Sequence, residues 1–526
     1  MKNLPFADIT IIVTYLFAMI GVGYYFSRNN RSAARFTKAS GSIPGWALGL
    51  SIYATFLSSN TFLGVPGKSF GTNWNAFVFS LSMPFAAWIA SKYFVPFYRS
   101  SGEISAYTHL EKRFGSWART YAVVCFLFTQ LARMGSIFFG IALSLQALTG
   151  YPMAGIMAVV GICIIFYTVL GGIEAVIWTE VVQGVIKTFG AILILYLIVK
   201  EIPGGFSGII SIGKQSDKFN LGTFDPDFKQ SSFWVILFYG FFMNLNNFGM
   251  DQNYVQRYHT AVSQKQASRS VWLCVIIYVP ASLLFFLIGT SLFAYYQVHP
   301  EMILSIKQQV AIETLGGHPS AAAVNNVVAN MQPADYGDKV MPHFMVTKLP
   351  AGILGLIISA ILSAAMSTIS SGMNASATVF TVDIYQRYYR SDLSDSRKLY
   401  VLRLATVLFG FAGLAAGIAM IGVKSVLDTW WEISGIFAGG MLGLFLLGII
   451  SRRTKSPEAF TATLIGMAVI LWMTFSKFIP EQYAFLRNPL NKNMVIVVGT
   501  LAIFLSGLIL TAAKRKQIIK LAVHDQ

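Results

Sequence analysis

The sequence predicts an all-α, polytopic membrane protein with about thirteen transmembrane helices. Its composition is the first reason: the 526 residues are 55% hydrophobic and only 12% charged, with a mean hydropathy of +0.61. Soluble domains carry about 25% charged residues. The second reason is a series of long apolar runs separated by charged loops. The third is that polar residues interrupt two of these runs, which is typical of the broken helices of transporters.

Thirteen apolar runs are each close to the 20 or so residues that a helix needs to cross a bilayer. The first run follows one lysine and has no small-residue cleavage pattern after it, so we expect a retained span and not a cleaved signal peptide. The predicted spans cover residues 7–27, 46–66, 74–98, 118–148, 152–171, 175–199, 233–255, 270–297, 348–383, 399–422, 426–450, 457–477 and 493–513.

Positive charge is unevenly distributed between the two sides of the predicted membrane. Lysine and arginine are concentrated in the loops after odd-numbered spans and in the C-terminal tail, 514–520. Cytoplasmic loops carry this excess, so we expect the N-terminus outside and the C-terminus in the cytoplasm of a multi-pass cell-membrane protein. The long loops 200–232 and 298–347 then lie outside. Two amphipathic segments of the second loop, Ile303–Leu315 and Ala321–Met331, could cover the outer surface.

The composition also excludes several function classes. The net charge of +17 lies in membrane-flanking loops, which argues against a nucleic-acid partner. The cysteines Cys125, Cys163 and Cys274 all lie in apolar runs and suggest neither disulfides nor a metal site. The histidines show no metal-ligand spacing and no catalytic arrangement, so an enzyme is not expected. No obligate protein partner is indicated.

Two spans are interrupted at corresponding positions, by residues 54–61 and by residues 244–253. Five spans separate their starts, so the two segments cross the membrane in opposite directions, as in a transporter built from inverted repeats. The expected organisation is an additional first helix and loop (1–45), a first repeat (46–199), an extracellular loop (200–232), a second repeat with the long loop 298–347 (233–451), and two additional helices with a basic tail (452–526).

The span 348–383 carries many hydroxyl groups. A membrane helix gains nothing by turning them toward lipid, so they should face protein, water or an ion. Close packing of helices through small residues is the alternative. On a helix, four polar side chains form one stripe and two hydroxyls flank it: Ser363, Ser367, Ser370 and Asn374, with Thr368 and Ser371.

Three basic residues, Lys92, Arg133 and Lys187, fall within predicted spans. We expect Lys92 and Lys187 to extend their ammonium groups to the membrane surface. Arg133 lies mid-span, where an arginine costs at least about 2.5–3.5 kcal/mol. It therefore needs a carboxylate or a group of carbonyls for its donors. A solute carboxylate is one such partner, and an acidic residue of another span is the alternative.

The segment from Gly171 to Gln183, GGIEAVIWTEVVQ, resembles the GG-x-x-AV-x-WTD-x-x-Q motif of the sodium/solute symporter family. Three further segments match in order: Ala54–Phe62, Ser363–Tyr385 and Leu444–Ile449. The resemblance extends over roughly residues 5–515 and is nearest to the bacterial sodium/sialic acid symporters, followed by the sugar-transporting members. It implies the LeuT-type fold, with five-plus-five inverted repeats, and sodium-coupled symport by alternating access.

The resemblance implies two sodium sites that share the serine-rich helix. The first would use the carbonyls of Ala54, Leu57 and Ala364 with the side chains of Ser367 and Thr368. Neutral oxygens suit a hard cation and hold it weakly enough for release. The second would use Glu180, Ser367, Ser370 and Ser371, with Glu180 in place of the family's shorter Asp. Ser363 and Asn374 are assigned to helix packing.

The resemblance also implies a solute site between the broken helices. Arg133 would bind a solute carboxylate, Ser58 and Thr61 would add donors, and Asn244 would bind a hydroxyl or amide. Phe56 and Ser80 stand where the sialic acid members have threonine and glutamine, so the remaining contacts should differ.

The expected function is sodium-coupled import of an organic anion, foremost sialic acid (N-acetylneuraminate), with one or two sodium ions. A neutral sugar or polyol, a small monocarboxylate, or a transporter-like sensor are the alternatives. Trp430 and Trp431 are expected in an interfacial aromatic belt, and the lining of an outer vestibule is the alternative.

Overall fold

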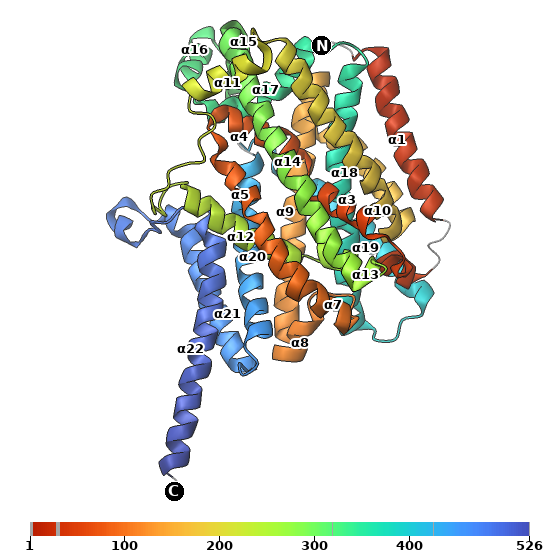
Figure 1. Cartoon of the computed structure of the whole chain (residues 1–526), viewed down its shortest axis with the longest axis vertical. Coiled ribbons are helices and arrows are strands. Elements are labelled where there is room, and N and C mark those ends of the chain that lie inside the picture. The colour runs from red at the N-terminus through yellow and green to blue at the C-terminus, as the bar shows by residue number, and fades with distance from the viewer. Residues whose placement is uncertain (1–3, 28–31, 318, 424–425, 525–526) are drawn as a thin grey trace.

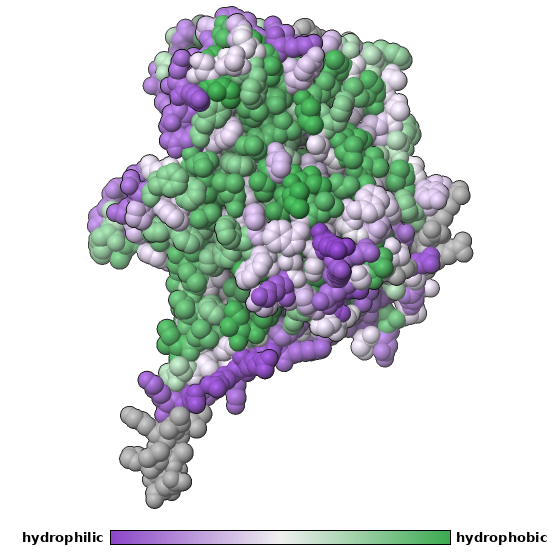
Figure 2. Space-filling model, viewed as in Figure 1, coloured by the Kyte–Doolittle hydropathy of each residue, from purple (hydrophilic) through white to green (hydrophobic). Residues whose placement is uncertain are grey.

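The structure is a computed structural model that describes residues 4–27, 32–317, 319–423 and 426–524. Within these ranges the regular elements are helices joined by loops, and the one strand-like pairing is an isolated bridge between Ile43 and Ala261. Hydrophobic side chains cover the middle of the visible surface, whereas hydrophilic ones gather toward its two ends (Figure 2). The predicted all-α membrane architecture is confirmed.

The first part of the chain forms eleven helices, with short π- or 3₁₀-helical turns between some of them. They are α1 (Phe6–Ser27), α2 (Ala33–Lys38), α3 (Gly45–Phe56), α4 (Val65–Gly71), α5 (Val78–Leu81), α6 (Met83–Ile89), α7 (Val95–Ser101), α8 (Thr108–Phe114), α9 (Ser116–Thr149), α10 (Met153–Lys200) and α11 (Gly205–Gln215) (Figure 1).

The second part begins with the helix that carries the second predicted interruption. Its helices are α12 (Phe233–Met250), α13 (Gln252–Thr260), α14 (Gln264–Val298), α15 (Pro300–Leu315), α16 (Ala321–Asn330), α17 (Pro333–Lys348), α18 (Ile353–Val379), α19 (Asp395–Ala419), α20 (Val426–Ile450), α21 (Ser456–Phe475) and α22 (Met494–His524).

The predicted number of thirteen spans is not confirmed. Among the described residues, ten helices are long and apolar enough to cross a membrane, and the bent pair α3–α4 raises this number to eleven. The 48-residue helix α10 covers two predicted spans, which meet at a kink at Gly172, whose φ of 57° and ψ of −164° are accessible only to glycine at low cost. The predicted span 233–255 is divided at Asp251 into α12 and α13.

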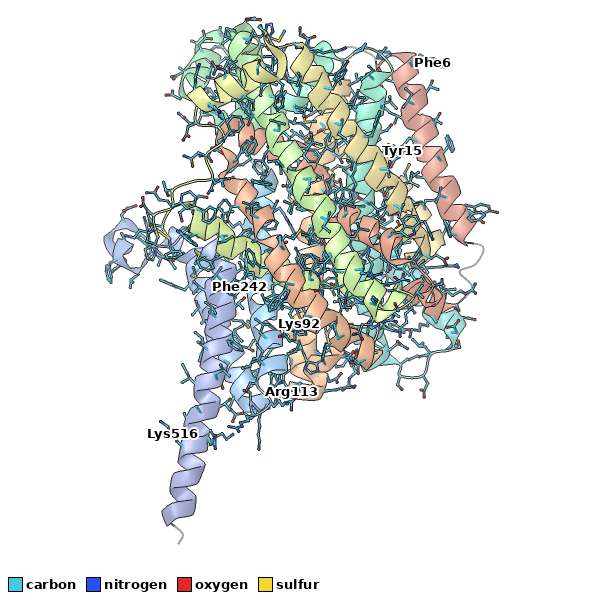
Figure 3. The ribbon with its side chains drawn as sticks, in the orientation of Figure 1. Phe6, Tyr15, Lys92, Arg113, Phe242 and Lys516 are labelled. Carbon is cyan, nitrogen blue, oxygen red and sulfur yellow. The ribbon has the colours of Figure 1, made fainter. Side chains whose placement is uncertain are left out.

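The two ends of the molecule differ as the charge distribution predicts. Helix α1 begins at one end and α22 finishes at the other (Figure 1). Lys92, Arg113 and Lys516 lie toward the lower part of the molecule, away from Phe6 (Figure 3). The basic end matches the expected cytoplasmic side, and the orientation in the membrane stays a prediction.

The long loop 298–347 folds as the helices α15, α16 and α17 at the end opposite the basic residues (Figure 1). Helix α17 crosses α4 at two glycines, where a Cβ added to Gly337 would lie 2.7 Å from the carbonyl oxygen of Gly67. The Phe70 and Tyr336 rings pack beside this crossing, with centroids 5.9 Å apart. The loop therefore contacts the outer half of the first broken helix.

Candidate functional site

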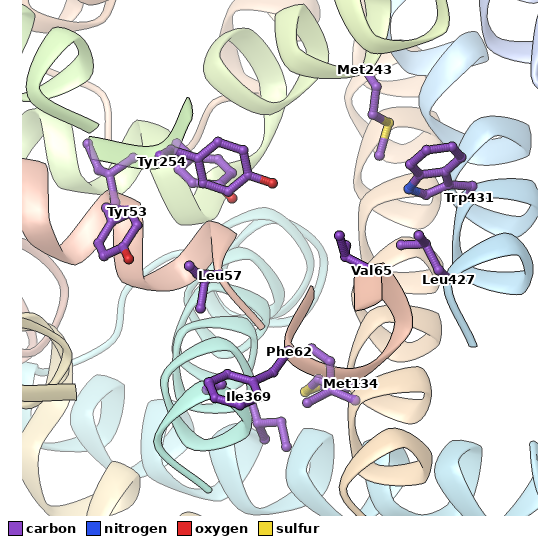
Figure 4. Packing of buried hydrophobic residues seen from close by; sticks show 14 of the residues in the cluster. Tyr53, Leu57, Phe62, Val65, Met134, Met243, Tyr254, Ile369, Leu427 and Trp431 are labelled. Carbon is purple, nitrogen blue, oxygen red and sulfur yellow. The ribbon is translucent and has the colours of Figure 1, made fainter. Parts of the chain in front are cut away.

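The first broken helix is interrupted between the end of α3 at Phe56 and a π-helical turn that begins at Asn60. Leu57 leaves helical geometry with φ −88° and ψ 85°, and the chain resumes in a π-helical turn, Asn60–Gly64, after a bend of 59°. Figure 4 shows the interruption between Leu57 and Phe62, close to the helix that carries Ile369. Because the helix stops here, the carbonyls of Ala54 and Leu57 are free to bind groups on other helices.

The ammonium group of Lys187, on α10, lies among the predicted ligands of the first sodium site. Its Nζ donates to the carbonyl oxygens of Ala54 at 2.6 Å and Leu57 at 2.8 Å, and to the Ser367 hydroxyl at 2.9 Å. All four residues are completely buried. The predicted oxygens therefore do converge, and they surround a cation that belongs to the chain itself.

The other two predicted ligands of this site lie at its edge. The hydroxyl of Thr368 donates to the carbonyl of Thr55 at 3.2 Å, and the Ala364 carbonyl accepts from Ser367 at 3.3 Å and from Thr368 at 3.4 Å. The bond from Thr368 to Thr55 attaches α18 to the end of α3, whereas the two bonds to Ala364 lie within α18. We call this group of Ala54, Leu57, Ala364, Ser367 and Thr368 the first cage.

The expectation that Lys187 extends to the membrane surface is wrong. The residue is 0% exposed, whereas Lys92 is exposed and its Nζ lies 5.1 Å from the centroid of the Trp88 ring. The difference arises because α10 packs against α3 and α18, so the middle of its inner face is enclosed by protein. A buried ammonium needs polar acceptors, and the broken helix provides them.

A second basic side chain, Arg257 on α13, lies at the predicted second sodium site. Its Nη2 donates to both carboxylate oxygens of Glu180, at 2.8 and 2.7 Å, to the Ser371 hydroxyl at 2.6 Å and to the Thr55 hydroxyl at 3.0 Å. Its Nε donates to the Ser51 hydroxyl at 2.8 Å. Ser51 and Ser371 also donate to Glu180. We call these five residues the arginine cluster.

Of the four predicted ligands of the second site, the structure brings together Glu180 and Ser371. Ser367 instead contacts Lys187, and the hydroxyl of Ser370 donates to the Ser367 carbonyl of its own helix at 3.2 Å. Sequence reasoning missed Arg257 because it lies after the second interruption in a segment rich in polar residues. The available signal was that Glu180, a buried acid in a membrane helix, requires a partner.

The predicted solute site is a cavity of about 80 Å³ between the broken helices. Five of the six predicted solute residues line it: Phe56, Ser58, Thr61, Ser80 and Arg133. Thr55 and Thr368 also line it, so the cavity adjoins both the arginine cluster and the first cage.

Arg133 has an acidic partner inside the protein. Its Nη1 donates to Asp251 Oδ2 at 3.0 Å, and its guanidinium carbon lies 5.1 Å from the centroid of the Trp430 ring. Asp251 is also the residue at which α12 ends, and its Oδ1 accepts from the amide of Asn253 at 2.9 Å. Arg133 therefore has the alternative partner expected from the sequence, an acidic residue of another predicted span. Within the described part of the chain, the structure gives no hydrogen bond to Nε or Nη2 of Arg133.

Asn244 is not among the described residues that line the cavity, so its contact with the solute stays a prediction. Its Nδ2 faces the backbone of Phe79 (3.3 Å) and the hydroxyl of Ser82 (3.2 Å), and the side chain that lines the cavity is Asn247, one turn later. The Oδ1 atom of Asn247 is buried without a hydrogen-bond partner among the described residues. The three-residue shift places Asn247 on the cavity face because α12 stays helical up to Met250.

Aromatic side chains form much of the cavity wall. Phe56 stacks on Tyr254 with centroids 4.7 Å apart, and Trp431 stacks on Phe79 at 5.5 Å. Trp430 and Trp431 line the cavity, which favours the predicted alternative of a vestibule lining over an interfacial belt. Figure 4 shows Trp431, Met243 and Tyr254 around this space.

An ion-pair network lies at the end of the molecule that carries the basic residues. Arg119 contacts Asp383 at 2.6 Å and Glu111 at 2.6 Å, and Arg387 contacts Glu111 at 2.7 Å. Burial opposes ionisation of Glu111, but the hydrogen bonds from Arg119 and Arg387 hold the pKa of that carboxyl below its usual range. The network links α8 and α9 to the π-helical continuation of α18.

Comparison with known proteins shows which family has this sequence and architecture. The family model of the sodium:solute symporter family matches residues 36–466. The sodium/sialic acid symporter NanT of Aliivibrio fischeri is 31% identical over 93% of this chain and 91% of its own length. SiaT of Proteus mirabilis, a sodium/sialic acid symporter, is 31% identical over 95% of each chain.

A solved structure of a Na⁺-coupled sialic acid symporter, substrate-bound and outward-open, shares this fold. It superposes with a TM-score of 0.83 at 30% identity, over 97% of this chain and 98% of that chain. The LeuT-type architecture expected from the resemblance is thereby confirmed.

Proposed function

The chain belongs to the sodium:solute symporter family, and we propose that it imports a carboxylate-bearing solute, foremost sialic acid, by sodium-coupled symport. It is a multi-pass membrane transporter and not an enzyme. The coupling ion and the solute class are those named for its relatives, the sodium/sialic acid symporters.

The proposal of a carboxylate-bearing solute rests on the guanidinium of Arg133, which lines the cavity. Nη1 is held by Asp251, so the fork is fixed in position while Nε and Nη2 are available to a ligand. Arginine donors in this geometry match the two oxygens of a carboxylate. Ser58 and Thr61 line the same cavity and add hydroxyl groups beside it.

The cavity wall offers further kinds of contact beside the guanidinium of Arg133. Asn247 and Ser80 offer polar atoms, and Phe56 and Tyr254 offer flat aromatic faces for apolar parts of the solute. A sialic acid presents both polar and apolar surfaces together with its carboxylate.

Transport requires the two sides of the cavity to open in turn. The bonds of Ser367 and Thr368 to the end of α3 hold α18 against the break, so whatever cation occupies the first cage affects the geometry of the solute site beside it. On the inner side, release requires that Arg119 separate from Asp383 and Glu111. Helix α18 and its π-helical continuation thus connect the first cage, the solute cavity and the ion pairs of Arg119.

A neutral sugar or polyol is the second candidate, and one observation favours it. Asp251 already neutralises Arg133, so the cavity does not require an anionic ligand for charge balance at that residue. A solute that offers hydroxyls alone could bind the free Nε and Nη2 donors.

Uptake into proteoliposomes separates the two candidates. N-acetylneuraminate, pyruvate and galactose are each offered with a sodium gradient and with a choline gradient. We expect sodium-stimulated uptake of N-acetylneuraminate, lost in Arg133→Ala and kept in Arg453→Ala, which removes an exposed arginine. Uptake of galactose alone, or N-acetylneuraminate uptake that is unchanged in Arg133→Ala, would overturn the assignment of an acidic solute.

A further inference from the structure

We propose that the ammonium of Lys187 is a tethered cation that occupies the first cage, so that a sodium ion binds there only in exchange for it. The inference concerns a residue for which neither the family resemblance nor the relatives' names assign a role. It rests on the proposed function only in taking sodium as the ion that competes for this position.

All three donors of the ammonium are satisfied by oxygens of the first cage. An ammonium has three N–H donors, and three oxygens lie at 2.6, 2.8 and 2.9 Å from Nζ: those of Ala54, Leu57 and Ser367. Two of these are carbonyl oxygens at the end of α3, and the third is a hydroxyl of α18. Lys187 therefore joins α10, α3 and α18 at the position where the predicted sodium ion would join α3 and α18.

The ammonium and a sodium ion cannot share this position. A sodium ion bound to the same oxygens would lie in the volume that Nζ fills, because both cations need these oxygens in direct contact. Two unit charges at such a separation repel strongly in a medium from which water is excluded. Since Lys187 and the cage residues are fully buried, no solvent is present to screen that repulsion.

The chemistry of the cage makes an exchange possible. All of its ligands are neutral, so neither cation forms an ion pair there. Neutral oxygens hold a cation weakly enough for it to be released. Arg257 differs because it is bonded to both oxygens of a carboxylate. Replacing it by a free cation would break this ion pair.

The charges around the cavity are consistent with a tethered cation. Three basic side chains, Lys187, Arg257 and Arg133, face two acids, Glu180 and Asp251. One positive charge is thus in excess when Lys187 is in the cage, before any ion binds, and this equals the charge of one monovalent anion. If sodium entered beside the ammonium, a second uncompensated charge would be buried, which is costly.

Sodium titration of the purified protein tests the inference directly. The thermal stability of the wild type, Lys187→Met, Lys187→Gln and Lys92→Met is followed against sodium concentration, with choline keeping the ionic strength constant. We expect the sodium concentration for half-maximal stabilisation to fall about tenfold or more in both Lys187 variants, because the competitor is removed. Lys92→Met removes the other in-span lysine, which is exposed, and should titrate like the wild type.

Two results would overturn the inference. One is an identical sodium titration in the wild type and in whichever Lys187 variant folds. If Lys187→Met does not fold, Lys187→Gln provides a shorter, uncharged side chain that keeps N–H donors. The other is a sodium response in the wild type that both Lys187 variants lose, because this would make Lys187 a support of the sodium site and not its competitor.

Uptake measurements distinguish a failure of the inference from a failure of the proposed function. Sodium-driven uptake in the wild type with an unchanged sodium titration in Lys187→Met overturns the inference and leaves the proposed function standing. Solute uptake in the wild type that needs no sodium, together with a sodium response gained in Lys187→Met, supports the tethered cation and overturns sodium as the coupling ion of the wild type.

Discussion

Lys187 and Arg257 are both buried cations beside the same broken helix, but they are held differently. Lys187 is bonded to two carbonyls and a hydroxyl, all neutral. Arg257 is bonded to both oxygens of the Glu180 carboxylate and to three hydroxyls. A paired charge contributes to holding the structure, whereas a charge among neutral dipoles can be replaced by another cation of similar size. The first cage is therefore the exchangeable site, and the arginine cluster is the structural one.

The serines of α18 make this difference accessible to experiment. Ser367 and Ser371 are one helical turn apart, and each accepts a hydrogen bond from one of the two cations. Ser370 lies between them in sequence and donates to the Ser367 carbonyl of its own helix. Three alanine substitutions on one helix thus probe the cage, the cluster and a reference position.

The largest effect is expected from Arg257→Met. This change leaves Glu180 buried without its cationic partner, and breaking a buried ion pair in this way costs about 3–5 kcal/mol. We expect a markedly lower midpoint of thermal unfolding for the protein purified in detergent.

The double variant Arg257→Met/Glu180→Gln is the matched control. It removes the unpaired carboxylate and should recover part of the lost stability. If Arg257→Met unfolds at the wild-type temperature, Arg257 is not a structural cation, and the distinction between the two sites fails.

Ser371→Ala should have the next largest effect, a loss of about 1.5–3 kcal/mol. Its hydroxyl accepts from Arg257 and donates to Glu180, and hydrogen bonds to charged groups contribute about this much. Denaturant or thermal unfolding measures the loss. We expect no change in the sodium concentration for half-maximal stabilisation, and a large shift in that concentration would mean that a sodium ion binds in the arginine cluster.

Ser367→Ala should have a smaller effect on stability, about 1–2 kcal/mol, because Lys187 loses one acceptor and keeps the two carbonyls. Unlike Ser371→Ala, this substitution should also change sodium binding. Removing a ligand shared by both cations weakens sodium binding in the Lys187→Met background, which a sodium titration of the double variant measures. An unchanged titration there would show that sodium does not use the first cage.

Ser370→Ala should have the smallest effect, within about 0.5 kcal/mol of the wild type. A serine that bonds back to its own helix contributes little, and alanine is a better helix former. Sodium titration is the decisive measurement, since the family resemblance assigns Ser370 to a second sodium site. A clear loss of sodium response in Ser370→Ala would support that assignment against the contacts seen here.

The membrane class, the helical fold and the break in α3 could all be predicted from the sequence. Hydropathy is a local property and determines which segments are buried in lipid. The break at Leu57 and the hydroxyl stripe of α18 are also local, since each depends on residues adjacent along the chain. The second break was predicted too broadly, over residues 244–253, because the cluster of asparagines there is compatible with a helix that stays intact up to Asp251.

The partners of the charged residues could not be predicted in the same way. Arg133 and Asp251 are far apart in sequence, as are Glu180 and Arg257, and their pairing depends on how α9, α10 and α13 pack. Asn244 and Asn247 are three residues apart on one helix. Which of them faces the cavity depends on the rotation of α12 against its neighbours, which periodicity alone leaves open.

By itself the sequence determined that this chain is a helical membrane transporter with an interrupted helix, a run of hydroxyls opposite it and an arginine in mid-span. Each of these follows from the cost of polar groups in lipid, which every segment meets separately. Only the tertiary structure decided that the cations beside the break are Lys187 and Arg257. A long basic side chain can reach the membrane surface or a buried acceptor, and the packing of the surrounding helices selects between them.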